Sequence, residues 1–333
     1  MRVKEKLLEV RELSVAFKYD GKFLPQTRDV GFDIYRGEIL GLVGESGSGK
    51  SVTSKVLLQL LPPTESRILC GSALFEGEDL LTRPRSQMYD IRGNKISMIF
   101  QEPMTSLNPV YTCGDQIMEA VMLHQHLDKR AARSKAIEMM AFVGIPLPEV
   151  RINSYPHEMS GGMRQRVMIA MALSCNPTLL IADEPTTALD PTIQAQIMEL
   201  LVRLQKETGM SVLYISHDLG VIAEICDRVA VMYAGTIMEI ADVHDLFYDP
   251  WHPYTIGLLR SMPRMDSSRE KLETIEGTVP HFSEMPEGCP FAPRCKYASA
   301  QCREGGMPPM AEFGSHCVRC WNRTAVKEAL KNG

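Results

Sequence analysis

One run of eight residues constrains this chain more than any other part of it. Gly44-Glu45-Ser46-Gly47-Ser48-Gly49-Lys50-Ser51 fills every fixed position of the pattern G-x-x-x-x-G-K-[ST]. The residues from Glu38 to Val43 predict a short buried strand before it, and apolar residues recur at helical spacing from Ser51 to Leu61 after it. A glycine-rich turn between a strand and a helix is the setting in which this pattern binds phosphate, so an ordinary turn is a poor explanation.

The residue types of this loop suit a nucleoside triphosphate. Glycines let backbone N–H groups approach phosphate without a Cβ in the way, and a helix N-terminus adds partial positive charge. Lys50 is expected to reach the β- and γ-phosphates, and the Ser51 hydroxyl to ligate Mg²⁺. We therefore predict that all eight residues line an ATP site and that Mg²⁺ is a cofactor.

Composition narrows the class of protein. The chain has 333 residues, enough for about two domains, and its net charge of −5 offers no basic surface for nucleic acid. The longest apolar run, Val167 to Leu173, is far too short to cross a bilayer, and no secretory signal is expected at the N-terminus. We expect a cytoplasmic protein, which could still dock on a membrane protein.

The pattern of apolar residues predicts an α/β fold. Residues 7–35 alternate apolar and polar, which indicates antiparallel strands, and residues 71–81 resemble a hairpin. Either Phe17 or Tyr19 is a candidate to stack on adenine, although a core position is equally expected for each. Strands and helices then alternate, which predicts a mostly parallel sheet covered by helices. Strands are expected at residues 96–100, 178–182, 211–216, 228–233 and 236–239, and helices at residues 115–143, 167–173, 192–205 and 219–225.

Polar residues follow several of these strands, where open α/β sheets bind ligands. Cleaving a phosphoanhydride requires a metal ion and an oriented water. We expect Asp183 and Gln101 to hold Mg²⁺, Glu184 to polarise the attacking water as general base, and His217 to contact the γ-phosphate. Each residue alone has an ordinary structural explanation. Together, after a phosphate loop, they indicate ATP hydrolysis.

A second candidate anion site reads Ser160-Gly161-Gly162. Ser160 is placed to cap the helix that follows, and a hydroxyl with flexible backbone at a helix N-terminus suits phosphate. One nucleotide has no evident need for two such sites on one chain. We therefore predict a head-to-tail dimer, in which each nucleotide lies between the phosphate loop of one chain and residues 160–162 of the other.

Nine cysteines are unevenly distributed. Cys70, Cys113, Cys175 and Cys226 are scattered singly and are expected to be buried apolar residues. Five others crowd a C-terminal region, from residue 250 onward, that is rich in Pro, Gly and Cys, and in a cytoplasmic chain this predicts a metal site that staples a small domain. These five are Cys289, Cys295, Cys302, Cys317 and Cys320.

The order of these motifs resembles the nucleotide-binding domain of ABC transporters. The resemblance makes residues 44–51 the Walker A motif, Gln101 the Q-loop, residues 179–184 the Walker B motif, Asp190 the D-loop, and His217 the H-loop. It makes residues 160–162 the signature that touches the partner's ATP, with Met159 and Met163 in place of the usual Leu and Gln. It implies a P-loop ATPase at residues 7–250, with a RecA-like core, an antiparallel β subdomain and a helical subdomain at about 102–175. Residues 251–333 become a C-terminal, cysteine-rich, metal-binding domain.

Three further stretches are similar to the ATPases of dipeptide/oligopeptide importers. They are Gln101 to Pro109, His252 to Thr255, and Gly288 to Cys295 with Cys302 following. This branch implies ATP-powered peptide import from the cytoplasmic face of the bacterial plasma membrane, as a peripheral subunit. Its implied partners are a homologous second ATPase, two permease subunits and an extracytoplasmic peptide-binding protein. It also implies a [4Fe-4S] cluster on Cys289, Cys295, Cys302 and, in preference to Cys317, Cys320.

Several alternatives stay open at this point. Four thiolates also suit zinc, although only Cys317 and Cys320 form the close pair that is common in zinc sites. Nickel and oligosaccharide importers belong to the same branch. A soluble ABC ATPase that acts on nucleic acid or ribosomes usually has coiled coils, tandem domains or basic patches, and none is evident here. A nucleotide-dependent redox sensor depends on the cysteines alone.

Overall fold

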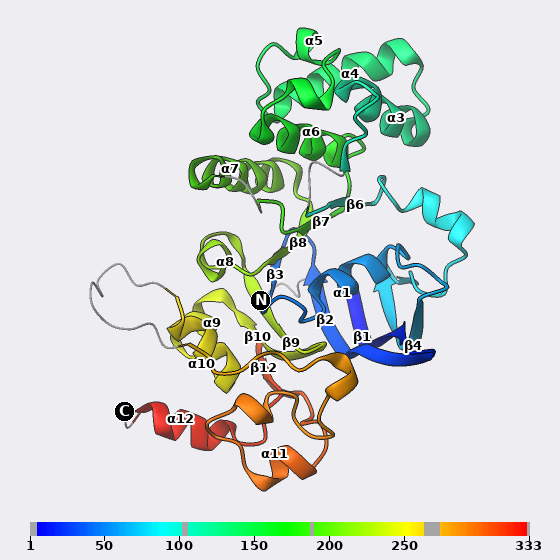
Figure 1. The fold of residues 1–333 in the computed structure, drawn as a ribbon. Helices are drawn as coiled ribbons and strands as arrows, with labels where there is room; N and C mark the ends of the chain where they lie inside the picture. The colour runs from blue at the N-terminus through cyan, green and yellow to red at the C-terminus, as the bar shows by residue number, and fades with distance from the viewer. Residues whose placement is uncertain (1–4, 102–105, 187–189, 263–273, 332–333) are drawn as a thin grey trace. The chain divides into compact units, whose positions relative to one another are not determined.

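The computed structural model of the chain describes residues 5–101, 106–186, 190–262 and 274–331. The chain forms two compact units (Figure 1). The first unit is made of residues 1–5, 35–38 and 82–215, and the second of residues 6–34, 39–81 and 216–333. The phosphate loop therefore belongs to the second unit, whereas Gln101, Ser160 and the Asp183-Glu184 pair belong to the first.

Three parallel strands carry the polar residues of the first unit. β7 (Leu179–Asp183) pairs with β6 (Ile96–Ile99) on one side and with β8 (Ser211–Ser216) on the other. Every residue of β7 and β8 is buried, as expected for parallel strands that are covered on both faces. The three strands confirm those predicted from the apolar runs.

Helices make up most of the rest of the first unit (green in Figure 1). The prediction of one continuous helix over residues 115–143 is wrong, because the helix is interrupted at residues 126–128. His126 adopts a left-handed φ of 54°, and the Asp128 carboxylate then accepts a hydrogen bond from Ala131 N at 2.8 Å, which caps a new helix. The helices are α3 (Cys113–Gln125), α4 (Lys129–Phe142), α5 (Pro148–Arg151), α6 (Gly161–Leu173) and α7 (Pro191–Thr208).

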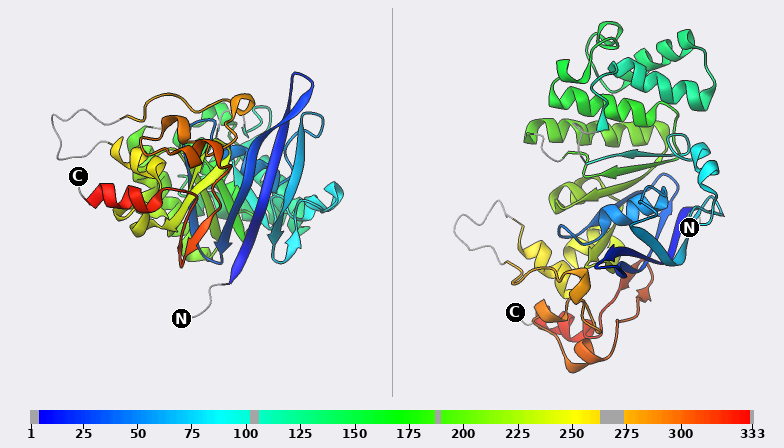
Figure 2. Two further views of the ribbon diagram at one scale, coloured as in Figure 1. Left: turned by 90° about the horizontal axis from the view of Figure 1, so that it is seen from below. Right: turned by 45° about the vertical axis from the view of Figure 1, so that its right-hand side comes forward.

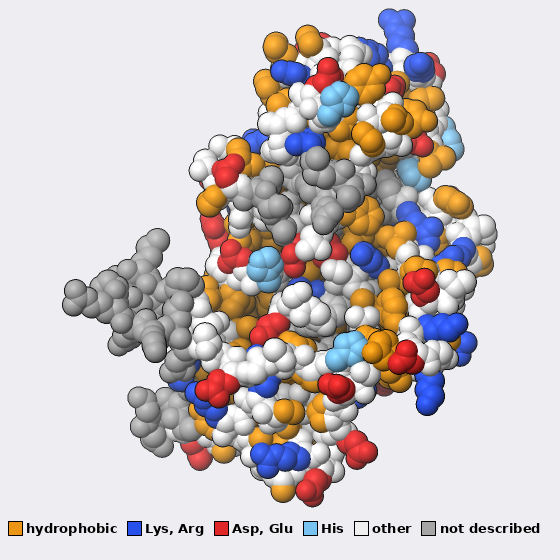
Figure 3. Space-filling model, viewed as in Figure 1, with side chains coloured by type: hydrophobic (Ala, Val, Ile, Leu, Met, Phe, Trp, Pro, Cys, Tyr) orange, Lys and Arg blue, Asp and Glu red, His pale blue; other side chains and the backbone are white. Residues whose placement is uncertain are grey.

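Several large apolar side chains lie exposed on the helical part of the first unit. Val110, Tyr111, Leu123, Leu147 and Val150 are each between 56% and 71% exposed. Figure 3 shows orange apolar side chains gathered over the part that holds α3 to α6, at the top of the view. Exposed apolar side chains that gather on one surface mark contacts with other proteins more often than singly scattered ones do.

Within the described ranges, no helix is both long and apolar enough to span a bilayer.

Antiparallel strands begin the second unit, as the alternating pattern predicts. The sheet has the order β2–β1–β4–β5, and its long blue strands are seen in Figure 2. Cys70 lies on an exposed stretch of this sheet, so the prediction that it is buried is wrong; the other three scattered cysteines are buried. The strands are β1 (Lys6–Tyr19), β2 (Lys22–Tyr35), β4 (Ser66–Phe75) and β5 (Glu78–Asp79).

A second set of strands in this unit carries the phosphate loop. β3 (Ile39–Val43) runs parallel to β9 (Arg228–Tyr233), and antiparallel pairing continues through β10 (Thr236–Asp242) and β12 (His316–Val318) to β11 (Ala311–Phe313). The C-terminal strand β12 thus extends the sheet next to β10. The helices are α1 (Lys50–Leu57), α8 (Leu219–Ile225), α9 (Val243–Tyr248), α10 (Pro253–Arg260), α11 (Ala300–Glu304) and α12 (Arg323–Lys331).

Helix α1 is shorter than the apolar spacing predicts. It ends at Leu57 rather than Leu61, because Gln59 takes a left-handed φ of 49° and Leu60 N donates to Lys55 O at 2.9 Å. This is the pattern of a Schellman motif, which satisfies the last helical carbonyls and stops the helix.

A buried carboxylate anchors the C-terminal residues to β10. Glu239 has no exposed area and accepts hydrogen bonds from Trp251 N at 2.6 Å, from His252 N at 3.0 Å and from His316 Nε2 at 2.7 Å. The Trp251 ring stacks on the His316 imidazole with 3.8 Å between centroids. A buried carboxylate requires such partners, so these contacts couple Trp251, His252 and His316 to the strand beside them.

Candidate functional site

The phosphate loop connects β3 to α1 and curls around its own lysine. Lys50 is the first residue of α1 and only 5% exposed, and its ammonium donates to Gly44 O at 2.7 Å and Glu45 O at 3.1 Å. Gly49 occupies the N-cap, where no side chain accepts from the helix. The first N–H groups of α1 are therefore directed into the loop, which is the arrangement that receives phosphate.

The phosphate loop packs against β9 and the turn that follows β9. Gly44 has a φ of +156°, and a Cβ at this position would overlap the carbonyl oxygen of Met232. Gly235 N donates to Ser48 O at 2.8 Å, and Gly235 O accepts from Arg28 N at 2.8 Å. Gly235 thus braces the loop from a distant turn, and no sequence motif singled it out.

In the first unit, the structure brings Gln101 and Glu184 together. The Gln101 side-chain amide donates to a Glu184 carboxylate oxygen at 2.9 Å. Glu184 has a φ of 47°, and its amide donates to Ile215 O at 3.0 Å, which sets the path of the chain after β7. Asp183, the last residue of β7, is 2% exposed. Oxygen atoms of this kind are what Mg²⁺ prefers.

Ser160 of the predicted signature and Asp190 of the predicted D-loop act as helix caps. The Ser160 hydroxyl accepts from Met163 N at 3.3 Å at the start of α6, which confirms its predicted role as N-cap. Asp190 caps α7 in the same way, accepting from Ile193 N at 3.0 Å. Ser160 is exposed, so its cap geometry presents the N-terminus of α6 at the surface.

The remaining nucleotide candidates lie in the second unit. His217 is exposed just after β8, and Asp218 caps α8 by accepting from Gly220 N at 2.8 Å. Phe17 is half-buried on β1, whereas the Tyr19 ring contacts the rings of His281 and Phe282 at 5.4 and 5.5 Å. That the loop, Asp183, Glu184 and His217 meet around one nucleotide stays a prediction.

Four of the five C-terminal cysteines line one small cavity: Cys289, Cys295, Cys302 and Cys320. Burial, with the nearby thiols adding to it, raises the pKa of Cys289 to about 11 and that of Cys320 to about 12. Asn322 Nδ2 also donates to the Cys302 sulfur at 3.4 Å. Within the described part of the chain, however, no three His, Cys, Asp or Glu side chains are already arranged to hold a metal ion.

Cys317 does not line this cavity. It lies on β12, where it opposes Ile240 of β10 and Glu312 of β11. Cys320 follows the end of the strand and lines the cavity with the other three cysteines. Of Cys317 and Cys320, the two candidates for the fourth ligand, Cys320 is therefore the one that lines the cavity.

Two family profiles match separate parts of the chain. The family profile described as "ABC transporter" matches residues 27–187, and that described as "Oligopeptide/dipeptide transporter, C-terminal region" matches residues 238–302. The chain is 51% identical over 317 residues to the dipeptide transport ATP-binding protein DppD of Bacillus subtilis, covering 95% of each. It is also 51% identical over 317 residues to the oligopeptide transport ATP-binding protein OppD of the same organism, covering 95% of this chain and 88% of that one.

A solved structure shares the fold. The dimeric structure of the ATP-binding cassette MJ0796 in a post-hydrolysis state, bound to ADP and Pi, has a TM-score of 0.63 and 26% sequence identity. It covers 71% of this chain and 98% of its own.

Proposed function

The chain belongs to the ATP-hydrolysing subunits of ABC transporters that carry the oligopeptide/dipeptide C-terminal region, and from this we propose that it powers the import of dipeptides or oligopeptides. The observation that carries the proposal is the likeness to peptide-transport subunits across both parts of the chain, with half of the residues identical over 95% of its length. The phosphate loop, which closes around Lys50, would bind the ATP whose hydrolysis powers this transport.

In the proposed reaction, the loop and the N-terminus of α1 bind the triphosphate, and Lys50 turns from the loop carbonyls to the β- and γ-phosphates. Ser51, Gln101 and Asp183 would hold Mg²⁺, which offsets phosphate charge. Glu184 takes a proton from water as the water oxygen bonds to the γ-phosphorus and the bond to ADP breaks. His217 steadies the phosphoryl oxygens.

The second nucleotide face comes from another subunit. Ser160, Gly161 and Gly162 lie at the exposed N-terminus of α6, where a partner's phosphates would meet backbone N–H groups. ATP would close this dimer and hydrolysis would reopen it. The proposed partner is a homologous second ATPase, so that the pair is a heterodimer.

Two permease subunits would receive this motion through the helical segment near residues 101–160. The exposed apolar side chains there, such as Leu147 and Val150, suit a protein contact. The subunit would then sit peripherally at the cytoplasmic face of the bacterial plasma membrane, in a complex with an extracytoplasmic peptide-binding protein. A nickel or oligosaccharide cargo is the alternative within the same branch.

The cysteine-lined cavity is proposed to hold a [4Fe-4S] cluster, with zinc as the alternative. The donor chemistry suits such a group, because four thiols line one cavity. Bound thiolates would hold the C-terminal region together, and because burial raises the pKa of Cys289 and Cys320, these two thiols must lose a proton on binding. Iron and sulfide analysis of protein purified without oxygen tests this. A colourless protein with stoichiometric zinc would reject the cluster.

The decisive experiment is purification of the intact complex from its native membrane, followed by transport of candidate peptides, nickel and oligosaccharides. We expect two permeases, a second ATPase and ATP-dependent uptake of peptide. Recovery of ribosomes or DNA without a permease would overturn the proposal, and uptake of nickel alone would change the cargo.

A further inference from the structure

Glu45, in the phosphate loop, is held by a residue 249 positions away. Arg294 donates from Nη1 to one Glu45 carboxylate oxygen at 2.6 Å and from Nη2 to the other at 3.1 Å. This is the paired, charge-assisted geometry that makes arginine–carboxylate contacts strong. The Arg294 side chain is 5% exposed and that of Glu45 is 30% exposed, so water weakens the contact less than it would at an open surface.

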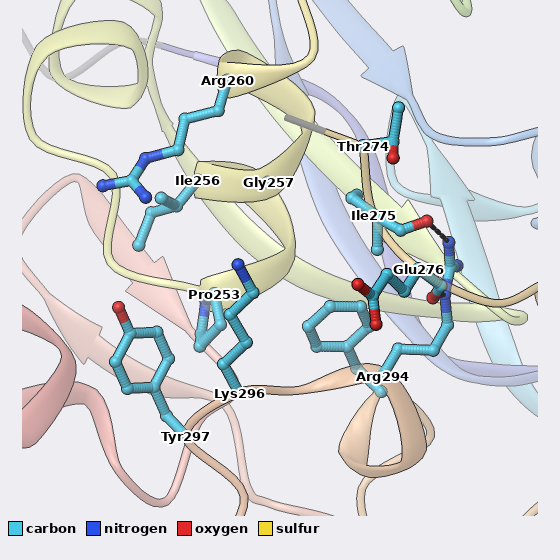
Figure 4. A pocket seen from close by; sticks show the side chains of 11 residues that line it. Pro253, Ile256, Gly257, Arg260, Thr274, Ile275, Glu276, Arg294, Lys296 and Tyr297 are labelled. Carbon is cyan, nitrogen blue, oxygen red and sulfur yellow. Dashed lines mark hydrogen bonds between the residues drawn. The ribbon is translucent and has the colours of Figure 1, made fainter. Parts of the chain in front are cut away.

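Arg294 is itself held in place by contacts other than those with Glu45. Its Nε donates to Glu276 O at 2.9 Å and its Nη2 to Ile275 O at 3.2 Å, the latter drawn as a dashed line in Figure 4. Its guanidinium carbon also lies 5.7 Å from the centre of the Tyr233 ring. Burial alone would lower the pKa of Arg294, but its hydrogen bonds to Glu45 and Tyr233 outweigh burial and raise it, so the cation persists at all working pH values.

The other groups of Glu45 are occupied as well. Its amide donates to the hydroxyl of Tyr254 at 3.0 Å, and its carbonyl accepts from Lys50 Nζ and from Ser48 N, each at 3.1 Å. The side chain, amide and carbonyl of one loop residue are therefore all fixed. The fixed positions of the phosphate-loop pattern do not include this glutamate, so the general phosphate-binding role of the loop does not by itself account for these contacts.

We propose that Arg294 is a positioning residue for ATP: it holds the phosphate loop in its binding shape through Glu45, and it offsets the negative charge of Glu45 next to the triphosphate. The C-terminal region thereby becomes part of the support of the nucleotide site. Arg294 also precedes Cys295, so the loop is tied to the wall of the cysteine-lined cavity.

The sign of each variant's effect follows from the charge. Arg294→Gln leaves an uncompensated carboxylate beside the phosphates, and we expect about tenfold weaker ATP binding. Glu45→Gln loses the tether but also removes the repulsion, so we expect only about threefold weaker binding. The double variant should bind ATP better than Arg294→Gln alone. Arg294→Lys, which keeps the charge without the paired geometry, should lie between Arg294→Gln and the unmodified protein.

The test uses the full chain, with ATP binding measured by titration, KM and kcat by phosphate release, and folding by thermal melting. Lys296→Gln is the matched control, because Lys296 is an exposed cation that lines the same pocket as Arg294, a pocket distinct from the cysteine-lined cavity (Figure 4). We expect KM to rise with little change in kcat in the Arg294 variants, and no change in Lys296→Gln. Additive losses in the double variant would overturn the proposal, as would unchanged binding in Arg294→Gln. If Arg294→Gln fails to fold, normal ATP binding by folded Glu45→Gln would overturn it too.

Discussion

Replacing Gly235 by alanine would test how the phosphate loop is supported. Gly235 and Ala234 form the two-residue turn between β9 and β10, with φ values of +81° and +46°. Gly235 donates to Ser48 O and accepts from Arg28 N. A Cβ at Gly235 would overlap the carbonyl oxygen of Gln26 and lie 3.0 Å from the Thr27 Cα. Both obstacles are backbone atoms of β2, so no side chain can rotate away.

The expected loss of stability has two parts. A left-handed φ costs an alanine about 1 kcal/mol relative to glycine. Relieving the overlap requires the turn or β2 to move, which is an overpacking cost of about 1–3 kcal/mol, and the hydrogen bond to Ser48 is weakened by about 1 kcal/mol. We expect Gly235→Ala to lower the free energy of unfolding by about 3–5 kcal/mol in total. Because Ser48 lies in the phosphate loop, we also expect about tenfold weaker ATP binding.

Gly77→Ala is the matched control. Glu76 and Gly77 form the same kind of two-residue turn, between β4 and β5, with φ values of 51° and 84°, and a Cβ on Gly77 meets no atom within 4 Å. This variant should pay only the backbone cost of about 1 kcal/mol and should bind ATP normally. Urea denaturation and ATP titration of both variants give the comparison. Equal losses of stability, or normal ATP binding by Gly235→Ala, would refute the reasoning.

Three further outcomes are expected. Glu184→Gln should keep ATP binding but lower kcat at least about 100-fold in a phosphate-release assay, and normal turnover would remove Glu184 from its role as base. Ser160→Asp should keep the cap of α6, so the protein's melting temperature should not change, but the ATPase rate of the assembled dimer should fall. Ser160→Ala removes the cap and should lower the free energy of unfolding by about 1 kcal/mol. An unimpaired ATPase rate in Ser160→Asp would argue against contact with the partner's ATP. In metal-free protein, alkylation of Cys289 should quicken about tenfold for each pH unit from 7 towards 10, because only the thiolate reacts and burial raises its pKa to about 11. Mass spectrometry with the exposed Cys70 as internal reference measures this, and a rate of Cys289 labelling that ignores pH would contradict it.

Where the apolar pattern erred, local hydrogen bonds decided the outcome. Residues 115–143 keep a helical period throughout, but the cap at Asp128 starts a second helix there. α1 stops early because Gln59 adopts a left-handed conformation. Neither event changes the spacing of apolar residues, so periodicity alone had no means to reveal it.

The nucleotide chemistry was determined by the sequence itself, because it resides in short contiguous motifs. In residues 44–51, the order of glycines, Lys50 and Ser51 sets both the backbone path and the groups that face phosphate. The caps of α6 and α7 are equally local, since Ser160 and Asp190 each accept from an amide three residues along the chain. Such features depend on neighbours that the sequence displays side by side.

Only the tertiary structure decided what supports that chemistry. Strand pairing brings Gly235 beneath Ser48, and the packing of the C-terminal region brings Arg294 to Glu45 across 249 residues. It also places Cys320 at the same cavity as three other cysteines, while Cys317 lies within β12. Contacts of this range depend on how the whole chain packs, and one residue's neighbours in sequence carry no record of its neighbours in space.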